Sequence, residues 1–437
     1  MDTMETAPET GPPGSGQGAW YSCVFCGLSP GLWLRLGLMM FLQYAIWGAW
    51  TTVIANHLID DLGFSGPAIG TICSLLYLAC ILTPFIGGQF ADRWVPTQYV
   101  IALLHVISGA AMWFAAGAKD FGSLWPPMLV AGLAYAPTLA LTNSLAFKHM
   151  SNTERQFGSV RVWGTIGWIV AGLVLAAWRR GAFGGIGLAA WPNQSDCLIL
   201  AAVFSGALAI FALTLPHTPP TKQAGNPWAF VEALKMLKNR SFLVFLIIAF
   251  VVTTELQFYY ILTAPFLKGI GIAQSDVSAW MVLAQVAEII AMAVALPLVL
   301  PRLGVGKTLA IGVIAWPIRY IIFSIGGPTW LVLASLTLHG VFYVFFFTVS
   351  MVYVDNVASD AIRHSAQSLI TLVTLGFGNY LGTFFTGYVQ KHFTTGVGEA
   401  AVVNWHGIFL VPVALTVACA VAFLLLFREA PKGEKIA

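Results

Sequence analysis

The stretch FGSVRVWGTIGWIVAG, from Phe157 to Gly172, is an apolar run that contains one arginine, Arg161. An arginine near the centre of a bilayer costs about 2.5–3.5 kcal/mol on membrane-insertion scales, so a chain that keeps one there usually has a use for it. Thr165 and Trp168 follow Arg161 at spacings of four and seven residues, which places the three side chains on one helical face. This pattern predicts one polar, aromatic wall of an internal cavity.

The composition indicates an all-α integral membrane protein that lies in a lipid bilayer. Of the 437 residues, 58% are hydrophobic and only 9% are charged, whereas soluble domains carry about 25% charged residues. The net charge of +3 is small for this length and gives no sign of nucleic-acid binding.

Twelve apolar runs are long enough to cross the bilayer, and an even number puts both termini on one side. Fourteen Lys and Arg residues lie in loops on that side against five on the other, so we expect both termini to be cytoplasmic in a multi-pass protein of the cytoplasmic (inner) membrane. The expected helices cover residues 34–57, 66–87, 98–118, 124–147, 158–178, 197–215, 241–266, 277–300, 307–326, 329–354, 366–389 and 405–427.

The longest basic, polar break covers residues 216–240 and divides the twelve helices into six and six. This division favours a major facilitator fold of two six-helix bundles. Within the break, Trp228, Val231 and Leu234 share a face, which predicts an amphipathic helix at the membrane surface. The expected parts are a disordered tail and lead-in (1–33), the first bundle (34–215), the linker (216–240), the second bundle (241–427) and a cytoplasmic tail (428–437).

The segment GGQFADRW, residues 87–94, fits a gating loop after the second helix, with Gly88, Asp92 and Arg93 in the pattern G-x-x-x-D-R. Glycine permits close helix approach, and the Asp–Arg pair can bridge neighbouring helix ends and break when the bundles rock. Cys23 and Cys26 form an isolated C-x-x-C with no second pair nearby, so we expect no metal, no other cofactor and no disulfide framework.

Several other expected helices carry polar and aromatic side chains at helical spacing. Amides and a carboxylate can donate to and accept from hydroxyl groups, and aromatic faces can stack on a ring. The set therefore favours a neutral ligand with several hydroxyls and a flat ring. Its members beyond the first stretch are Gln257, Tyr260, Gln285, Glu288, His339 and Tyr343.

Each of these residues also has a structural interpretation. Arg161 lies a few residues into its helix and could extend to the membrane surface. Glu288 could form a structural salt bridge with Arg161, and Gln257 and Gln285 could join helices by hydrogen bonds.

Six segments, in order and on the expected helices, resemble the nucleoside:proton symporters of the major facilitator superfamily. The resemblance extends over residues 34–427, nearly the whole membrane region. The segments are FLQYAIWGAW (41–50), LAYAPTLALTNSLAF (133–147), RVWGTIGW (161–168), LTLPHTP (213–219), ELQ (255–257) and AIRHSAQ (361–367).

This resemblance implies a central nucleoside site and uptake by alternating access, driven by protons. Residues of the family type stand at Arg161, Thr165, Gln257, Gln285 and Glu288. The family's aromatic positions are Trp168 and Tyr343 here.

Three positions depart from the family pattern, and they concern substrate and coupling. His339 stands where the family has a tyrosine, Tyr260 where it has an asparagine, and Val344 where it has the acid implicated in proton coupling. The sequence thus leaves Glu288, alone or with His339, as the proton-coupling candidate.

Other functions remain open at this point. The chain could be a facilitator without coupling, a carrier of another glycosylated heterocycle, or a sugar or drug carrier. It could also be a membrane sensor that binds a nucleoside without transporting it. We expect a monomer and no enzymatic activity, because no cluster of nucleophile and base stands out.

Overall fold

The computed structural model is almost entirely helical. A two-stranded antiparallel ribbon, in which β1 (Thr394–Thr395) pairs with β2 (Val402–Val403), joins two helices near the end of the chain. The residues that the structure describes are 27–91, 95–151, 153–184, 193–220, 228–359, 362–396 and 401–429.

Twelve helical segments of membrane-crossing character occur in these residues. Ten candidate spans are long and apolar enough, and Asp196–Ala212 is a shorter apolar helix. One span, Gln274–Ile325, contains two helices, because Gly304 has a φ of +77° and interrupts the helix there. The count and the all-helical membrane architecture agree with the sequence prediction.

The first six crossings form the N-terminal half. The first begins at Pro30, not at residue 34, because Ser29 caps the helix and accepts from the backbone N–H of Leu32. The elements are α1 (Pro30–Trp50), α2 (Ile54–Asn56), η2 (His57–Asp61), α3 (Gly66–Ala91), α4 (Thr97–Ala116), α5 (Phe121–Lys148), α6 (Thr153–Arg179) and α7 (Asp196–Ala212).

The last six crossings form the C-terminal half, and here most crossings are built from several helical pieces. They are α9 (Arg240–Gln257), η5 (Phe258–Leu262), α10 (Thr263–Gly269), α11 (Gln274–Ile290), η6 (Ala291–Ala295), α12 (Leu296–Ile325), α13 (Thr329–Ser335), α14 (Leu338–Phe342), η7 (Tyr343–Thr348), α15 (Val349–Val357), α16 (Arg363–Thr371), η8 (Leu372–Gly378), α17 (Asn379–His392) and α18 (Trp405–Leu426). The pieces η5, η6, η7 and η8 are π-helical turns, which frequently occur at functional sites.

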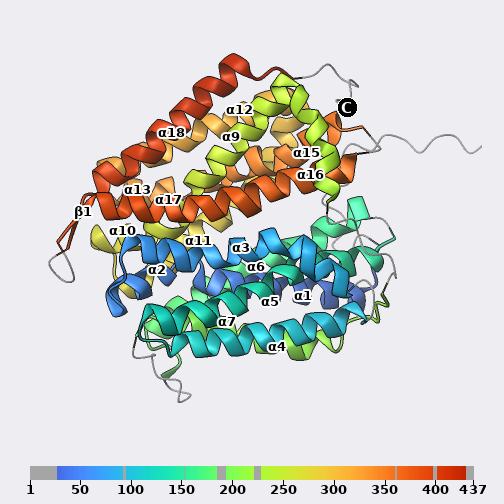
Figure 1. Ribbon diagram of the computed structural model, residues 1–437, viewed down its shortest axis with the longest axis horizontal. Coiled ribbons are helices and arrows are strands. Elements are labelled where there is room, and N and C mark those ends of the chain that lie inside the picture. Colours follow the sequence, from blue (N-terminus) through green and yellow to red (C-terminus); the bar gives the residue numbers. More distant parts are fainter. Residues whose placement is uncertain are drawn as a thin grey trace, which may run out of the picture.

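The two halves lie against each other along two helix pairs (Figure 1). In the figure the blue-to-green N-terminal half lies below the yellow-to-red C-terminal half, and α3 packs on α17 while α6 packs on α11. At the start of α3, a Cβ on Gly66 would overlap the carbonyl group of Gly387 in α17, and a Cβ on Gly387 would overlap that of Gly66. Glycine at both positions therefore permits the close contact of the two halves at this end.

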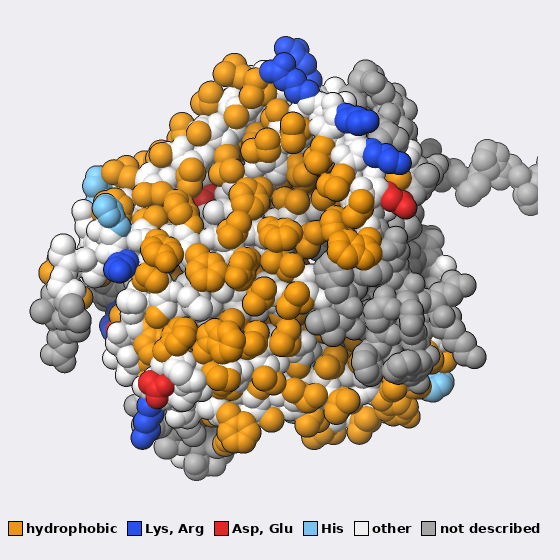
Figure 2. Space-filling view, viewed as in Figure 1, with side chains coloured by type: hydrophobic (Ala, Val, Ile, Leu, Met, Phe, Trp, Pro, Cys, Tyr) orange, Lys and Arg blue, Asp and Glu red, His pale blue; other side chains and the backbone are white. Residues whose placement is uncertain are grey.

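The surface agrees with a protein that lies in a bilayer. Figure 2 shows hydrophobic side chains across the middle of one face, while charged and histidine side chains gather mainly toward the ends of the helices. Large apolar side chains on these helices are exposed, for example Phe114 (72%), Ile210 (74%) and Leu425 (69%). Water would disfavour such exposure, whereas lipid tails accept it.

The linker between the halves contains a short helical segment, α8 (Ala229–Ala233) followed by the 3₁₀ turn η4 (Leu234–Lys238). Its apolar residues Trp228, Val231 and Leu234 are exposed on one side, while Ala233 and Met236 are buried, and α8 packs on α16. The position of this segment at the membrane surface stays a prediction. Of the expected gating residues, Gly88 belongs to α3, whereas Asp92 and Arg93 lie outside the described residues.

Candidate functional site

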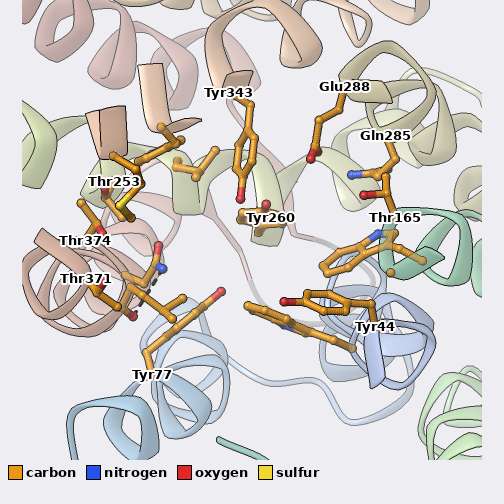
Figure 3. Close-up of a pocket in the computed structure, with 18 of the residues that line it drawn as sticks. Tyr44, Tyr77, Thr165, Thr253, Tyr260, Gln285, Glu288, Tyr343, Thr371 and Thr374 are labelled. Atoms are coloured by element: carbon orange, nitrogen blue, oxygen red, sulfur yellow. Dashed lines mark hydrogen bonds between the residues drawn. The ribbon is translucent and has the colours of Figure 1, made fainter. Parts of the chain in front are cut away.

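A cavity of about 250 Å³ lies between the two halves (Figure 3). Both halves contribute side chains to it. From the N-terminal half these are Tyr44, Trp47, Tyr77, Arg161, Gly164, Thr165 and Trp168; from the C-terminal half they are Thr253, Leu256, Tyr260, Gln285, Glu288, Tyr343, Phe347, Met351, Thr371, Thr374, Leu375 and Asn379.

The N-terminal wall is built around Arg161 of α6. Its guanidinium lies 4.0 Å from the ring centroid of Tyr44 in α1, a cation–π contact that holds the charge inside the protein. Gly164, one turn along, leaves room for the Tyr44 ring, since a Cβ there would lie 2.7 Å from Tyr44 Cδ2. Trp168 continues the wall and packs on Trp47 with ring centroids 5.6 Å apart.

The C-terminal wall carries Gln285 and Glu288 on α11, one turn apart. Among the described residues, Glu288 is the one carboxylate of the lining and Arg161 the one guanidinium. No salt bridge joins these two described side chains. The Oε1 atom of Gln285 is buried without a hydrogen-bond partner, and such an atom costs free energy unless a ligand or water satisfies it. This wall therefore places one amide and one carboxylate side chain at the cavity.

Seven of the nine side chains expected at the substrate site line this cavity together. They come from four elements in both halves (α6, η5, α11 and η7), and in Figure 3 the labelled ones point toward a common space. The seven are Arg161, Thr165, Trp168, Tyr260, Gln285, Glu288 and Tyr343.

The other two, Gln257 and His339, lie behind the lining. Gln257 is buried, and its Nε2 donates to Oδ1 of Asn379, which does line the cavity, at 2.6 Å. The ring of His339 is buried and stacks on Tyr343 with centroids 5.2 Å apart. Both residues thus contact the lining from behind.

His339 belongs to a buried polar cluster in the C-terminal half. Its Nδ1 lies 3.3 Å from Nη1 of Arg319, whose guanidinium also lies 4.4 Å from the ring centroid of Tyr259. Because a guanidinium can only donate, Nδ1 must be the acceptor, and the imidazole in this arrangement is neutral. His105 is likewise held inside the other half, between Gln43 (3.0 Å) and Ser205 (3.1 Å).

Sequence reasoning missed most of the C-terminal lining. Thr253, Thr371, Thr374 and Leu375 have no charge or ring to single them out, and the π-helical turn η8 shifts the spacing of cavity-facing residues on its helix. On the first helix, Gln43 bonds to Thr138 inside the N-terminal half, whereas its neighbour Tyr44 lines the cavity. Val344 is buried in an apolar cluster with Ala291 and Phe345.

At one end of the helices a set of polar contacts, which we call the latch, joins the two halves. Asp60 of η2 accepts from Nζ of Lys268 at 2.6 Å, and Arg180 pairs with Asp276 at 2.8 Å. Gln194 of the N-terminal half also accepts from Gln274 of the C-terminal half at 2.6 Å. The latch lies where α1 leaves the bilayer and α3 enters, at the same end as the Gly66–Gly387 contact.

The cavity approaches the opposite end, where α1 begins and α18 finishes. Met351 in the first turn of α15 and Thr371 at the end of α16 both line the cavity and are exposed. The latch thus joins the two halves at one end, and the exposed lining residues Met351 and Thr371 lie on the side of the cavity nearer the termini.

Residues 31–432 match the model of a family described as nucleoside H+ symporter. The chain is 36% identical to YegT of Escherichia coli (strain K12), with 90% of this chain and 93% of the relative covered. It is 29% identical to the Xanthosine permease of the same organism, covering 92% and 97%. Among solved structures, the crystal structure of the nucleoside transporter NupG superposes with a TM-score of 0.78 at 28% identity, covering 91% of this chain and 100% of that chain.

Proposed function

Since the chain belongs to the nucleoside H+ symporter family, we propose that it transports nucleosides across the membrane together with protons, by alternating access of the cavity to the two sides. The observation that carries the proposal is the cavity itself. It lies between two six-helix halves and combines one carboxylate, one guanidinium, amides and hydroxyls with several aromatic rings. A volume of about 250 Å³ lies just below the roughly 300–1,000 Å³ of ligand pockets, so the cavity has room for one small solute.

The lining supports a division of roles among the expected residues. Arg161, Thr165 and Gln285 would form hydrogen bonds to polar atoms of the nucleoside. Trp168 and Tyr343 would pack on its base, since stacking of a base on an aromatic ring contributes about 1–3 kcal/mol. Tyr260 would add a hydroxyl where the family pattern has an amide.

We assign proton coupling to Glu288 alone. It is the one titratable carboxylate of the lining, and Arg161 lies in the opposite wall. His339 is a weaker candidate because its Nδ1 already accepts from Arg319, and an imidazolium has no lone pair left to do so. Val344 stands where the family pattern has an acidic residue, and it is packed among apolar side chains, so it cannot carry the proton.

The orientation and the moving units are also part of the proposal. The excess of Lys and Arg on the side of the termini supports cytoplasmic termini in the inner membrane of a bacterium. In this orientation the latch would close the outer side, and the cavity would face inward. Residues 34–215 and 241–427 would rock about the cavity, in a monomer.

Uptake in cells that lack their own nucleoside permeases tests the function. We expect radiolabelled uridine or adenosine to accumulate, more strongly at an outside pH of 5.5 than of 8. Expression of an empty vector is the control. No uptake of any nucleoside at either pH would reject the proposed substrate class, and competition by sugars instead would favour a sugar carrier.

A further inference from the structure

The cavity has a second polar side that none of the expected site residues occupies. Thr253, Thr371, Thr374 and Asn379 line it, from α9, α16, η8 and α17. In Figure 3 the three threonines lie across the cavity from Glu288, Gln285 and Thr165, and the hydroxyl groups of the labelled tyrosines point into the space between the two sides. We call the four residues the neutral end, because none carries a charge.

The three threonine hydroxyls of the neutral end are prepared to accept hydrogen bonds. Each Oγ1 already donates its hydrogen to a backbone carbonyl one turn earlier in its own helix, at 2.7–2.8 Å. A hydroxyl that has given its one hydrogen to such a carbonyl can offer only lone pairs to a ligand. The carbonyls belong to Ala249, Gln367 and Ile370.

Asn379 supplies the donor of the neutral end. Its Oδ1 accepts from Gln257 at 2.6 Å, which fixes the orientation of the amide. The Nδ2 atom is left with only a long contact of 3.5 Å, to the carbonyl of Leu375. Gln257 therefore acts as a positioning residue for Asn379.

We propose that the neutral end binds the ribose hydroxyls, and that the base lies at the opposite side with Arg161, Gln285 and Glu288. This inference rests on the proposed function and specifies how that substrate lies. Ribose hydroxyls carry no charge and are donors that match the threonine lone pairs. The opposite side carries both charges and the rings of Tyr44, Trp47 and Trp168, which suit the flat edge and faces of a base.

Competition by deoxynucleosides tests this orientation. The inhibition constants of uridine and of 2′,3′-dideoxyuridine against radiolabelled uridine uptake are measured for the wild type, Thr253→Val and Thr374→Val. Valine has the shape of threonine but lacks the hydroxyl. We expect the wild type to prefer uridine about tenfold or more, and each valine variant to bind uridine several-fold more weakly with dideoxyuridine unchanged.

Two further variants separate a lost acceptor from a folding defect. Thr374→Ser keeps the hydroxyl and is expected to keep the preference for uridine. Thr263→Val removes a buried hydroxyl outside the lining and is expected to change neither constant.

The possible results distinguish this inference from the function on which it rests. Unchanged discrimination in both valine variants, or loss of discrimination in Thr165→Val instead, would overturn the orientation while leaving nucleoside transport intact. Absence of nucleoside uptake by the wild type would overturn the proposed function, and the orientation with it.

Discussion

Arg161 lies over the ring of Tyr44, at 4.0 Å from its centroid, instead of against a carboxylate. A membrane-buried guanidinium that is stabilised by a ring and lines a cavity keeps its hydrogen-bond donors available to a solute. Lysine would keep the charge but lose the planar fork of donors and part of the stacking. We therefore expect both the planar shape and the charge of the Arg161 guanidinium to matter for substrate binding.

Arg161→Lys should raise the half-saturation concentration for nucleoside uptake about tenfold, because the forked donors and the cation–π contact are together worth on the order of 1–2 kcal/mol. Kinetics of radiolabelled uridine uptake measure this. Arg302→Lys, an exposed arginine whose Nη1 lies 3.4 Å from the Leu298 carbonyl, is the matched control and should behave as the wild type. Equal kinetics in both variants would contradict the assigned role.

His339→Gln should leave the pH dependence of uptake unchanged. The glutamine oxygen can accept from Arg319 in place of Nδ1, while the variant has no titratable imidazole. Uptake rates measured between pH 5.5 and 8 check this. A flattened pH profile would mean that the histidine takes part in coupling.

For single residues, the sequence best predicts the candidate site where burying the side chain in a membrane has a high free-energy cost. Arg161, Gln285 and Glu288 could be predicted to lie in a cavity because buried charge and amides are rare in a bilayer. Thr253 and Thr374 could not be predicted to lie there. A threonine that donates to a carbonyl of its own helix is common and has little free-energy cost in any helix. The side chains of Gln257 and His339 have suitable chemistry but contact the lining from behind.

The contact between α3 and α17 is the clearest example of function at the level of helices. Gly66 and Gly387 bring the two backbones together at the latch end, so a side chain at either position would push the halves apart. The helix positions themselves were largely predictable, since apolar length sets them. The π-helical turns were not, because they depend on packing between helices and change which residues face inward.

Gly66→Ala should disfavour closure of the latch end, because overpacking of a close contact costs about 1–3 kcal/mol. We expect slower uptake and a lower melting temperature than for the wild type. Gly206→Ala in α7 is the matched control, because a Cβ there would meet nothing within 4 Å. Indistinguishable uptake rates and melting temperatures in the two variants would contradict the role given to this contact.

The whole molecule combines a closed latch at one end with a cavity between the two halves. Exposed ion pairs such as Asp60–Lys268 contribute only about 0–1 kcal/mol each, so a latch of this kind can close and reopen during each transport cycle. The two-bundle fold could be predicted from the six-plus-six division. Whether the latch is open or closed could not be predicted, because partners such as Asp60 and Lys268 lie 208 residues apart in the sequence.

Asp60→Lys and Lys268→Asp should each shift the population away from the closed latch, and the double variant should restore much of it because the charges are exchanged. Spin labels on cysteines at Lys119 and Lys391, exposed positions of the two halves at this end, report the distance by double electron–electron resonance. Longer distances in the single variants and a return in the double variant are expected. Identical distance distributions in the wild type, the two single variants and the double variant would mean that the latch has no part in the transport cycle.

The most direct measurement is uridine accumulation in proteoliposomes with an imposed pH gradient, acidic outside, for the wild type and Glu288→Gln. Asp355→Asn, a carboxyl outside the cavity lining that pairs with Arg363, is the control. The wild type and the control should accumulate uridine above its equilibrium level, whereas Glu288→Gln should exchange uridine without concentrating it. Gradient-driven accumulation by Glu288→Gln at the wild-type level would contradict the claim that this cavity couples nucleoside movement to protons.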